Sequence, residues 1–191
     1  FGPLSDKYGR RPLLLVSMLL FIVSTLFCLF APDIYSFVTL RLIQGIAGAG
    51  GIVISRSVAI DKFSGKELAK MLAVIGAING VAPVAAPVIG GLLTGSVGWQ
   101  GIFMILLFIG ILLGIGCIRF KESLPAEKRS KTGVWATFRS FGIIVHNRRY
   151  MLYVFQLAFA QGILFAYIAS SPFIIQQHYG FSPFASAFAF R

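Results

Sequence analysis

Long runs of apolar residues alternate with short charged segments along the whole chain. Five runs are complete, and a sixth begins near Phe181 and continues to Arg191. The complete runs are residues 12–31, 34–55, 71–97, 101–118 and 150–175. About 20 apolar residues are enough for a helix to cross a bilayer, and these runs lack the alternation of apolar and polar residues that a transmembrane β-barrel needs. The pattern therefore predicts an all-α polytopic membrane protein.

Basic residues occur in every second connection between the runs. The connections rich in Lys and Arg are residues 1–11, 56–70 and 119–149. The intervening connections contain no Lys or Arg, and they are residues 32–33, 95–100 and 176–183. Connections rich in Lys and Arg stay on the cytoplasmic side of a membrane. The three basic segments are therefore predicted to be cytoplasmic, and the other connections external.

The composition agrees with this fold class. Hydrophobic residues make up 57% of the 191 residues and charged residues 12%, whereas soluble domains carry roughly 25% charged residues. The net charge of +11 comes from basic residues confined to short segments. This distribution favours membrane topology over nucleic-acid binding. Cys28 and Cys117 both lie inside apolar runs and indicate no disulfide framework.

The longest connection, residues 119–149, is predicted to be a cytoplasmic linker. Four apolar side chains recur there at a three-residue step beside basic residues, and they are Trp135, Phe138, Phe141 and Ile144. This spacing is typical of a basic amphipathic helix in the membrane interface. An ordinary linker with chance periodicity is the alternative.

Arg41 is the one charged residue inside a complete apolar run. A charge within a span is costly, so Arg41 is expected to face the protein interior and to have a partner. Alternatively, its side chain extends to the external headgroups, since it lies about two turns from the end of its run. No Asp or Glu lies in a complete run, and His146 and His178 are isolated at run edges. The residues therefore indicate no catalytic site.

The run at residues 71–97 is rich in small residues and contains Pro83 and Pro87. Small residues let helices in lipid approach one another closely. Two prolines four residues apart should bend the helix. Two interpretations of this run remain. It forms either a closely packed helix that does not move or a bend that helps to decide which side of the membrane is open.

The opening sequence G-x-L-S-D-K-x-G-R-R matches the loop motif between the second and third helices of the major facilitator superfamily. The motif residues are Gly2, Asp6, Gly9, Arg10 and Arg11. Further along the chain, Arg41-x-x-Gln44-Gly45 resembles the fourth-helix motif of the same superfamily.

A third match is similar to the fifth-helix motif of the antiporters in this superfamily, with alanine in place of two glycines. Its residues are Ala82, Ala86, Pro87, Gly90 and Gly91. The region around Tyr167 resembles the seventh helix of bacterial drug:proton antiporters of the bicyclomycin/chloramphenicol-resistance type. Residues 122–125, with sequence ESLP, fit the same group.

The resemblance implies a fragment of a twelve-helix fold, with five full spans and the beginning of another. Helices 1 and 2, most of helix 8 and helices 9–12 are expected to lie outside this sequence. The implied parts are a motif loop (1–11), helices 3–6 of the first half (12–118), the central linker (119–149), and helix 7 with the start of helix 8 (150–191).

The resemblance also implies roles for individual residues. Asp6 would meet the N-terminus of a helix in the other half of the transporter and hold an inner gate shut. Arg10 would pair with Asp61 at the inner end of the fourth helix. Arg41, with Gln44, would favour the ionised form of a first-helix carboxylate and couple proton release to conformation. Four polar residues within the spans are candidates to face the substrate cavity, with a hydrogen bond to a neighbouring helix as the alternative for each, and they are Asn79, Gln156, Gln161 and Tyr167.

The function expected from this resemblance is proton-coupled efflux of drugs or other small amphipathic molecules across an inner membrane by alternating access. Such a protein would be monomeric and would not be an enzyme. It would use the proton gradient rather than a cofactor or metal, and it would bind no nucleic acid. The alternatives are a superfamily carrier for a metabolite, sugar or amino acid and, from another class, a helical membrane protein that transports nothing.

Overall fold

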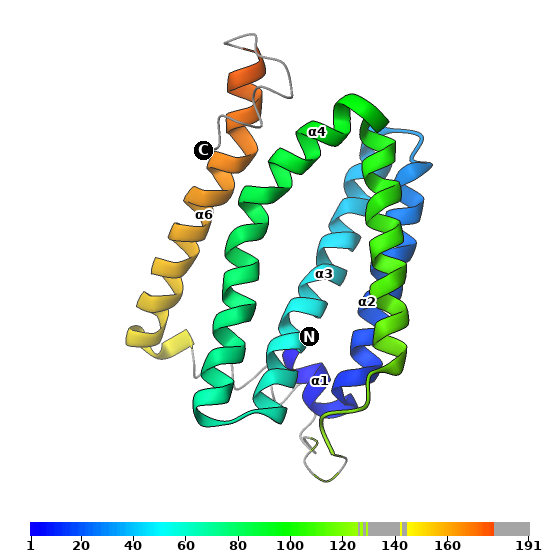
Figure 1. Cartoon of the computed structure of the whole chain (residues 1–191). Coiled ribbons are helices and arrows are strands. Elements are labelled where there is room, and N and C mark those ends of the chain that lie inside the picture. Colours follow the sequence, from blue (N-terminus) through cyan, green and yellow to red (C-terminus); the bar gives the residue numbers. More distant parts are fainter. Residues whose placement is uncertain (126, 128, 130–141, 143–144, 178–191) are drawn as a thin grey trace. The chain divides into compact units, whose positions relative to one another are not determined.

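The computed structural model describes residues 1–125, 127, 129, 142 and 145–177 (Figure 1). Every element of regular secondary structure among these residues is helical, which confirms the predicted all-α class. The helices are α1 (Gly2–Tyr8), α2 (Arg10–Leu29), α3 (Ile34–Lys62), α4 (Gly65–Arg119) and α6 (Arg148–Gln177). The chain divides into two compact units. The first unit comprises Phe1–Ile78 and Val97–Lys131, and the second comprises Asn79–Ser96 and Thr132–Arg191.

Four of the five complete apolar runs lie entirely in these helices, and the run 12–31 extends two residues beyond the end of α2. In the part of the chain that the structure describes, four helices are long and apolar enough to cross a membrane, namely Arg10–Leu29, Ile34–Lys62, Gly95–Arg119 and Arg148–Ile168. A fifth span is obtained when Gly65–Pro83 and Ala85–Leu93 are counted together. The sixth apolar run and most of the predicted amphipathic segment lie outside the described residues.

The long helix α4 is interrupted at two places. Gly98 has φ 67° and ψ −179°, which is not helical and divides α4 into two helices. Glycine adopts a positive φ without the steric cost that other residues meet. The pieces Gly65–Pro83 and Ala85–Leu93 are bent by 42° relative to each other. Since proline removes a backbone hydrogen bond and clashes with the preceding turn, Pro83 accounts for the bend that the sequence predicted.

The motif segment 1–11, expected to be a loop, is largely helical. Pro3 is compatible with the first turn of α1, where an N–H has no helical partner in any case, and the Ser5 hydroxyl donates to the Gly2 carbonyl at 2.8 Å. Gly9, with φ 101°, separates α1 from α2, which begins at Arg10. The basic connection 56–70 is likewise mostly helix, because α3 continues to Lys62 and α4 begins at Gly65.

The beginning of α3 is fixed by a side-chain cap. The Asp33 carboxylate accepts a hydrogen bond from the Ser36 backbone N–H at 2.7 Å, and it also accepts from the Ser36 hydroxyl at 3.0 Å. A side-chain oxygen at this position satisfies an N–H group that would otherwise have no partner. These hydrogen bonds lower the pKa of Asp33, so the cap is ionised at neutral pH.

Small residues form the contact between α2 and α3 in the first unit. Ser17, Ser24, Thr25 and Cys28 of α2 are all buried, and Gly50 of α3 is buried as well. Ser24 and Thr25 donate their hydroxyls to carbonyls of the preceding turn, so their polar atoms are satisfied. Many large apolar side chains are exposed instead. Small residues inside and large apolar residues outside are typical of helices that pack within lipid.

An aromatic cluster joins the start of α3 to the second part of α4. Phe37, Trp99 and Phe103 contact one another edge to face, with ring centroids 5.6 to 6.1 Å apart. Aromatic rings prefer this arrangement because a positive ring edge meets a negative ring face. Trp99 directly follows Gly98, so the part of α4 that contacts α3 begins at the break.

The close approach of α2 and α3 at Gly50 generates a stability prediction. A Cβ atom at Gly50 would clash with Ser17 Oγ, whereas one at Gly51 would have nothing within 4 Å. We expect Gly50→Ala to lower the free energy of unfolding by about 1–3 kcal/mol, the usual cost of overpacking. Gly51→Ala should be neutral or slightly stabilising. Thermal unfolding of the detergent-solubilised protein measures both, and equal melting temperatures would contradict the close contact.

Candidate functional site: the charge network around Arg10

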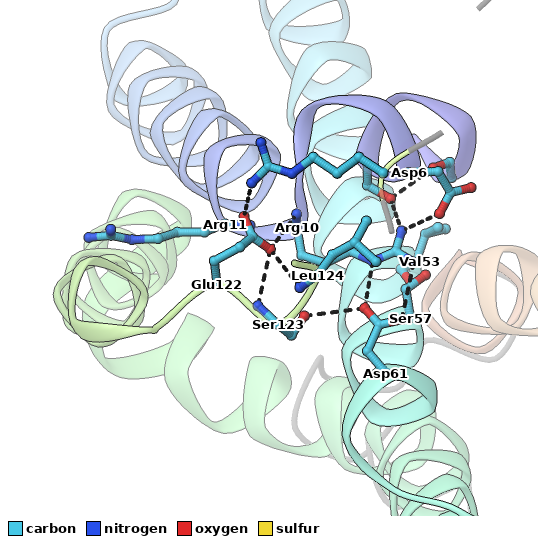
Figure 2. A network of polar contacts seen from close by, with 12 residues as sticks. Asp6, Arg10, Arg11, Val53, Ser57, Asp61, Glu122, Ser123 and Leu124 are labelled. Atoms are coloured by element: carbon cyan, nitrogen blue, oxygen red, sulfur yellow. Dashed lines mark hydrogen bonds and ion pairs between the residues drawn. The ribbon is translucent and has the colours of Figure 1, made fainter. Parts of the chain in front are cut away.

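Arg10 lies at the centre of a network of ion pairs and hydrogen bonds at the start of α2 (Figure 2). Its Nε donates to Asp61 Oδ2 at 2.9 Å and its Nη2 to Asp61 Oδ1 at 3.4 Å. Its Nη1 lies 2.7 Å from Asp6 Oδ1 and also donates to the Ser5 hydroxyl. Arg10 is only 7% exposed. The planar guanidinium therefore joins α1, α2 and α3 through one side chain.

The charges in this network stand at helix ends that do not favour them. Arg10 is the first residue of α2, and Asp61 lies in the last turn of α3. The N-terminus of a helix carries partial positive charge and the C-terminus partial negative charge, so each placement costs about 0.3–1 kcal/mol. Pairing the two side chains offsets both costs. Among Arg10, Asp6 and Asp61, it is Asp6, in α1, that keeps a half-exposed side chain.

A third acid, Glu122, joins the network from the segment that follows α4. Its Oε1 accepts from the Arg10 backbone N–H at 2.9 Å, and its Oε2 accepts from the Arg11 N–H at 3.2 Å. The same Oε1 accepts from the N–H groups of Ser123 and Leu124, both at 3.1 Å. Four backbone donors thus converge on one carboxylate.

These hydrogen bonds decide the ionisation of Glu122. Burial would raise its pKa, but the N–H group of Leu124, those of Arg10 and Arg11, and the charge of Arg129 outweigh burial and lower it. Because the folded-state pKa is depressed, the stability that Glu122 contributes is present at neutral pH. It is lost as the pH falls through that lowered pKa.

Further contacts tie the end of α4 to this region. Arg11 donates from its guanidinium to the Ile118 carbonyl at 2.9 Å, which satisfies an acceptor in the last turn of α4. Ser123 Oγ lies within hydrogen-bonding distance of Asp61 Oδ2, at 3.2 Å, and donates to it. Leu124 is buried. The segment after α4 is therefore anchored on both α2 and α3.

A separate polar cluster surrounds Arg41, the charge inside an apolar run. Arg41 donates to the Gln44 side-chain carbonyl, and Gln44 Nε2 in turn donates to the Thr25 hydroxyl at 2.6 Å. The guanidinium also lies over the Phe103 ring, 5.5 Å from its centroid. Arg41 thus has direct partners on α3 and on the second part of α4, and Gln44 links it to α2. Arg41 itself is exposed in this chain.

The other residues expected to be functional lie elsewhere. Gly2 begins α1, and a Cβ there would meet nothing within 4 Å. The antiporter-like motif lies in α4, where Ala82 is exposed and Pro87 is half-buried. The side chains expected to contact substrate are exposed and lie on α4 and α6, and they are Asn79, Gln156, Gln161 and Tyr167.

Two residues in these clusters, Glu122 and Thr25, have no role predicted from the sequence. Glu122 contributes there only to the family resemblance. The signal for Glu122 is an acid in a strongly basic connection, directly after a long apolar run. Thr25 gives no comparable signal, because a threonine within a span more often bonds only to its own helix.

These features define a polytopic helical membrane protein whose network around Arg10 is concentrated at helix ends. The profile of the Major Facilitator Superfamily matches residues 1–190. The chain belongs to this superfamily of membrane transporters.

Individual relatives agree with this family. The chain is 40% identical to an uncharacterized MFS-type transporter, YdgK, of Bacillus subtilis over 185 residues, covering 95% of the chain and 46% of the relative. It is 28% identical to a bicyclomycin resistance protein homolog of Haemophilus influenzae, covering 94% and 46%. It is 29% identical to the multidrug transporter MdfA of Yersinia pestis, covering 91% and 42%. The chain spans less than half of the length of each of these relatives.

The pairing of Arg10 with Asp61 can be tested by a double-mutant cycle. We expect Arg10→Ala and Asp61→Ala each to destabilise the protein, and the double variant to cost less than their sum. The coupling should be about 0.5–3 kcal/mol, the range for residues in one network. Arg10→Ala combined with Glu67→Ala, an exposed acid in the first turn of α4, should be additive. Unfolding of the purified protein measures all variants, and zero coupling would refute the pairing.

Proposed function

We propose that this chain is part of a drug transporter that exports small amphipathic molecules across a bacterial inner membrane in exchange for protons. The observation that carries the proposal is similarity over more than nine-tenths of the chain to relatives named for bicyclomycin resistance and multidrug transport. The chain would supply helices 3 to 7 and the start of helix 8 of a twelve-helix fold. The complete protein would act as a monomer, without a cofactor, using the proton gradient.

In this proposal the network around Arg10 is the inner gate. Alternating access needs each half of a transporter to move largely as a rigid body, and the ion pairs of Arg10 hold three helices together at one end. Asp6 is half exposed, so its carboxylate is accessible to the N-terminus of a helix in the other half. Unpaired N–H groups there stabilise an anion. With residues 1–11, 56–70 and 119–149 in the cytoplasm, this gate would close the cytoplasmic side.

Proton coupling is proposed to act through Arg41. A guanidinium within the membrane favours the ionised form of a nearby carboxylate, and that carboxylate would lie on a helix outside this chain. Gln44 and Phe103 orient the guanidinium from one side. The substrate, a hydrophobic or cationic drug, would meet a cavity to which Asn79, Gln156, Gln161 and Tyr167 contribute polar groups.

Antiport is tested with everted membrane vesicles that contain the complete transporter. We expect drug accumulation in the vesicles to require a pH gradient and to stop when the gradient is collapsed, because proton release drives the conformational cycle. Vesicles without the transporter are the control. Accumulation that is indifferent to the gradient would contradict antiport. Absent drug transport combined with uptake of a sugar, an amino acid or another metabolite would favour the alternative carrier.

The coupling role of Arg41 has its own test. We expect Arg41→Ala to lower proton-driven efflux by roughly tenfold or more, since a charge-assisted interaction is worth about 1.5–3 kcal/mol. Arg56→Ala removes the same charge from an exposed position on the same helix, α3, and should leave efflux within about twofold. Efflux is measured as the initial rate per amount of protein in the membrane. Equal rates for the two variants would exclude the coupling role.

A further inference from the structure

The N-terminus of α2 lacks the cap that its own sequence would normally supply. Gly9 occupies the capping position and has no side chain to bond to the first N–H groups. Those groups are among the donors that a helix start leaves without a helical partner. Glu122 takes this place from a position 112 residues further along the chain, accepting from both Arg10 and Arg11. The cap of α2 is therefore a tertiary contact.

Gly9 is required for this contact in two ways. Its φ of 101° lies in a region that side chains disfavour, and a Cβ atom there would lie 2.5 Å from Glu122 Oε2. The glycine thus leaves the space in which the carboxylate lies. The same carboxylate lies 3.7 Å from the guanidinium of Arg129. That guanidinium would also lie 3.0 Å from a Cβ atom at Gly9.

The exchange between α2 and α4 is reciprocal. Glu122, just after α4, bonds to the first N–H groups of α2, while Arg11, at the start of α2, bonds to the Ile118 carbonyl in the last turn of α4. Ser123 adds a hydrogen bond to the Asp61 oxygen that also accepts from Arg10 Nε. All these residues belong to the first compact unit.

We infer that Glu122 is a positioning residue of the proposed gate, which holds the start of α2 so that the Arg10 side chain stays between Asp6 and Asp61. Arg10 donates its backbone N–H to Glu122 and its side chain to the two aspartates. The direction of its guanidinium therefore depends on the first turn of α2, which Glu122 fixes. The negative charge of Glu122 also offsets two arginines at a helix end that disfavours cations.

This inference rests on the proposed function, because a gate implies two conformations between which the network chooses. Loss of the carboxylate loosens the first turn of α2 and weakens the contact of Arg10 with Asp6 and Asp61. The conformation with its cytoplasmic side open should then gain population. A cap with a purely structural role would instead change the stability of the fold and leave the two populations as they were.

The test measures conformation in the complete transporter by spin-label distances. Labels at Lys66→Cys and Tyr150→Cys, both exposed at the starts of α4 and α6, report the cytoplasmic side in a background without other reactive cysteines. We expect Glu122→Gln to raise the ratio of long to short distances roughly tenfold, a typical coupling between a contact and a conformational equilibrium. Glu127→Gln, an exposed acid in the same connection, should leave the ratio unchanged.

Glu122→Asp and Glu122→Ala complete the series. Aspartate keeps the charge and should restore part of the wild-type ratio, whereas alanine should exceed glutamine. If the Glu122→Ala variant does not fold, the distance ratios of the Glu122→Gln and Glu122→Asp variants still test the inference. A folded Glu122→Gln with the wild-type ratio, or with only a lower melting temperature, would overturn the inference. The distance measurement needs no drug, so it is independent of the proposed efflux. If the proposed function fails, the wild-type protein transports no drug, whatever the distance ratio of the Glu122 variants.

Discussion

The ion pair between Arg10 and Asp61 is the interaction on which the junction of α2 and α3 in the first unit depends most directly. Each charge stands at a helix end that disfavours it, so either one alone would destabilise its helix. Together they compensate each other and connect the start of α2 to the end of α3. Asp6, Ser5 and Ser123 then add hydrogen bonds to the same two side chains. A network of this kind is sensitive to the loss of any member, because the remaining charge stays partly buried.

The ion pair in turn requires that α2 and α3 approach each other closely. The buried residues of α2 are mostly small, and Gly50 of α3 leaves the space that Ser17 occupies. Lipid supplies no hydrophobic driving force between helices, so packing depends on how near the backbones can come. The same buried face contains Thr25 and Gln44, which bond to each other across the two helices. Packing and polar contacts are thus parts of one interface.

Much of this could be predicted from sequence, and the part that could not has a physical reason. The apolar runs predicted the helical class and the spans, because length and hydropathy decide membrane insertion. The resemblance pointed to Arg10 and Asp61, which the structure has in contact. The helical character of residues 2–8 was missed, since glycine and proline there resemble a turn. The capping role of Glu122 was missed because no periodicity links a loop acid to a backbone N–H more than 100 residues away.

The two polar clusters lie along the same pair of helices, and this arrangement bears on how a transporter could use them. From Arg10 to Thr25 is 15 residues of α2, about 22 Å at 1.5 Å per residue. Between them, the contact of Ser17 with Gly50 leaves little room for α2 to slide along α3. Under the proposed function, a change of charge near Arg41 would therefore move the helix pair as one body. Under the same proposal, that movement would reach the network of Arg10 through the rigid helix pair, and the hydrogen bonds of Glu122 to α2 would pass it to the end of α4.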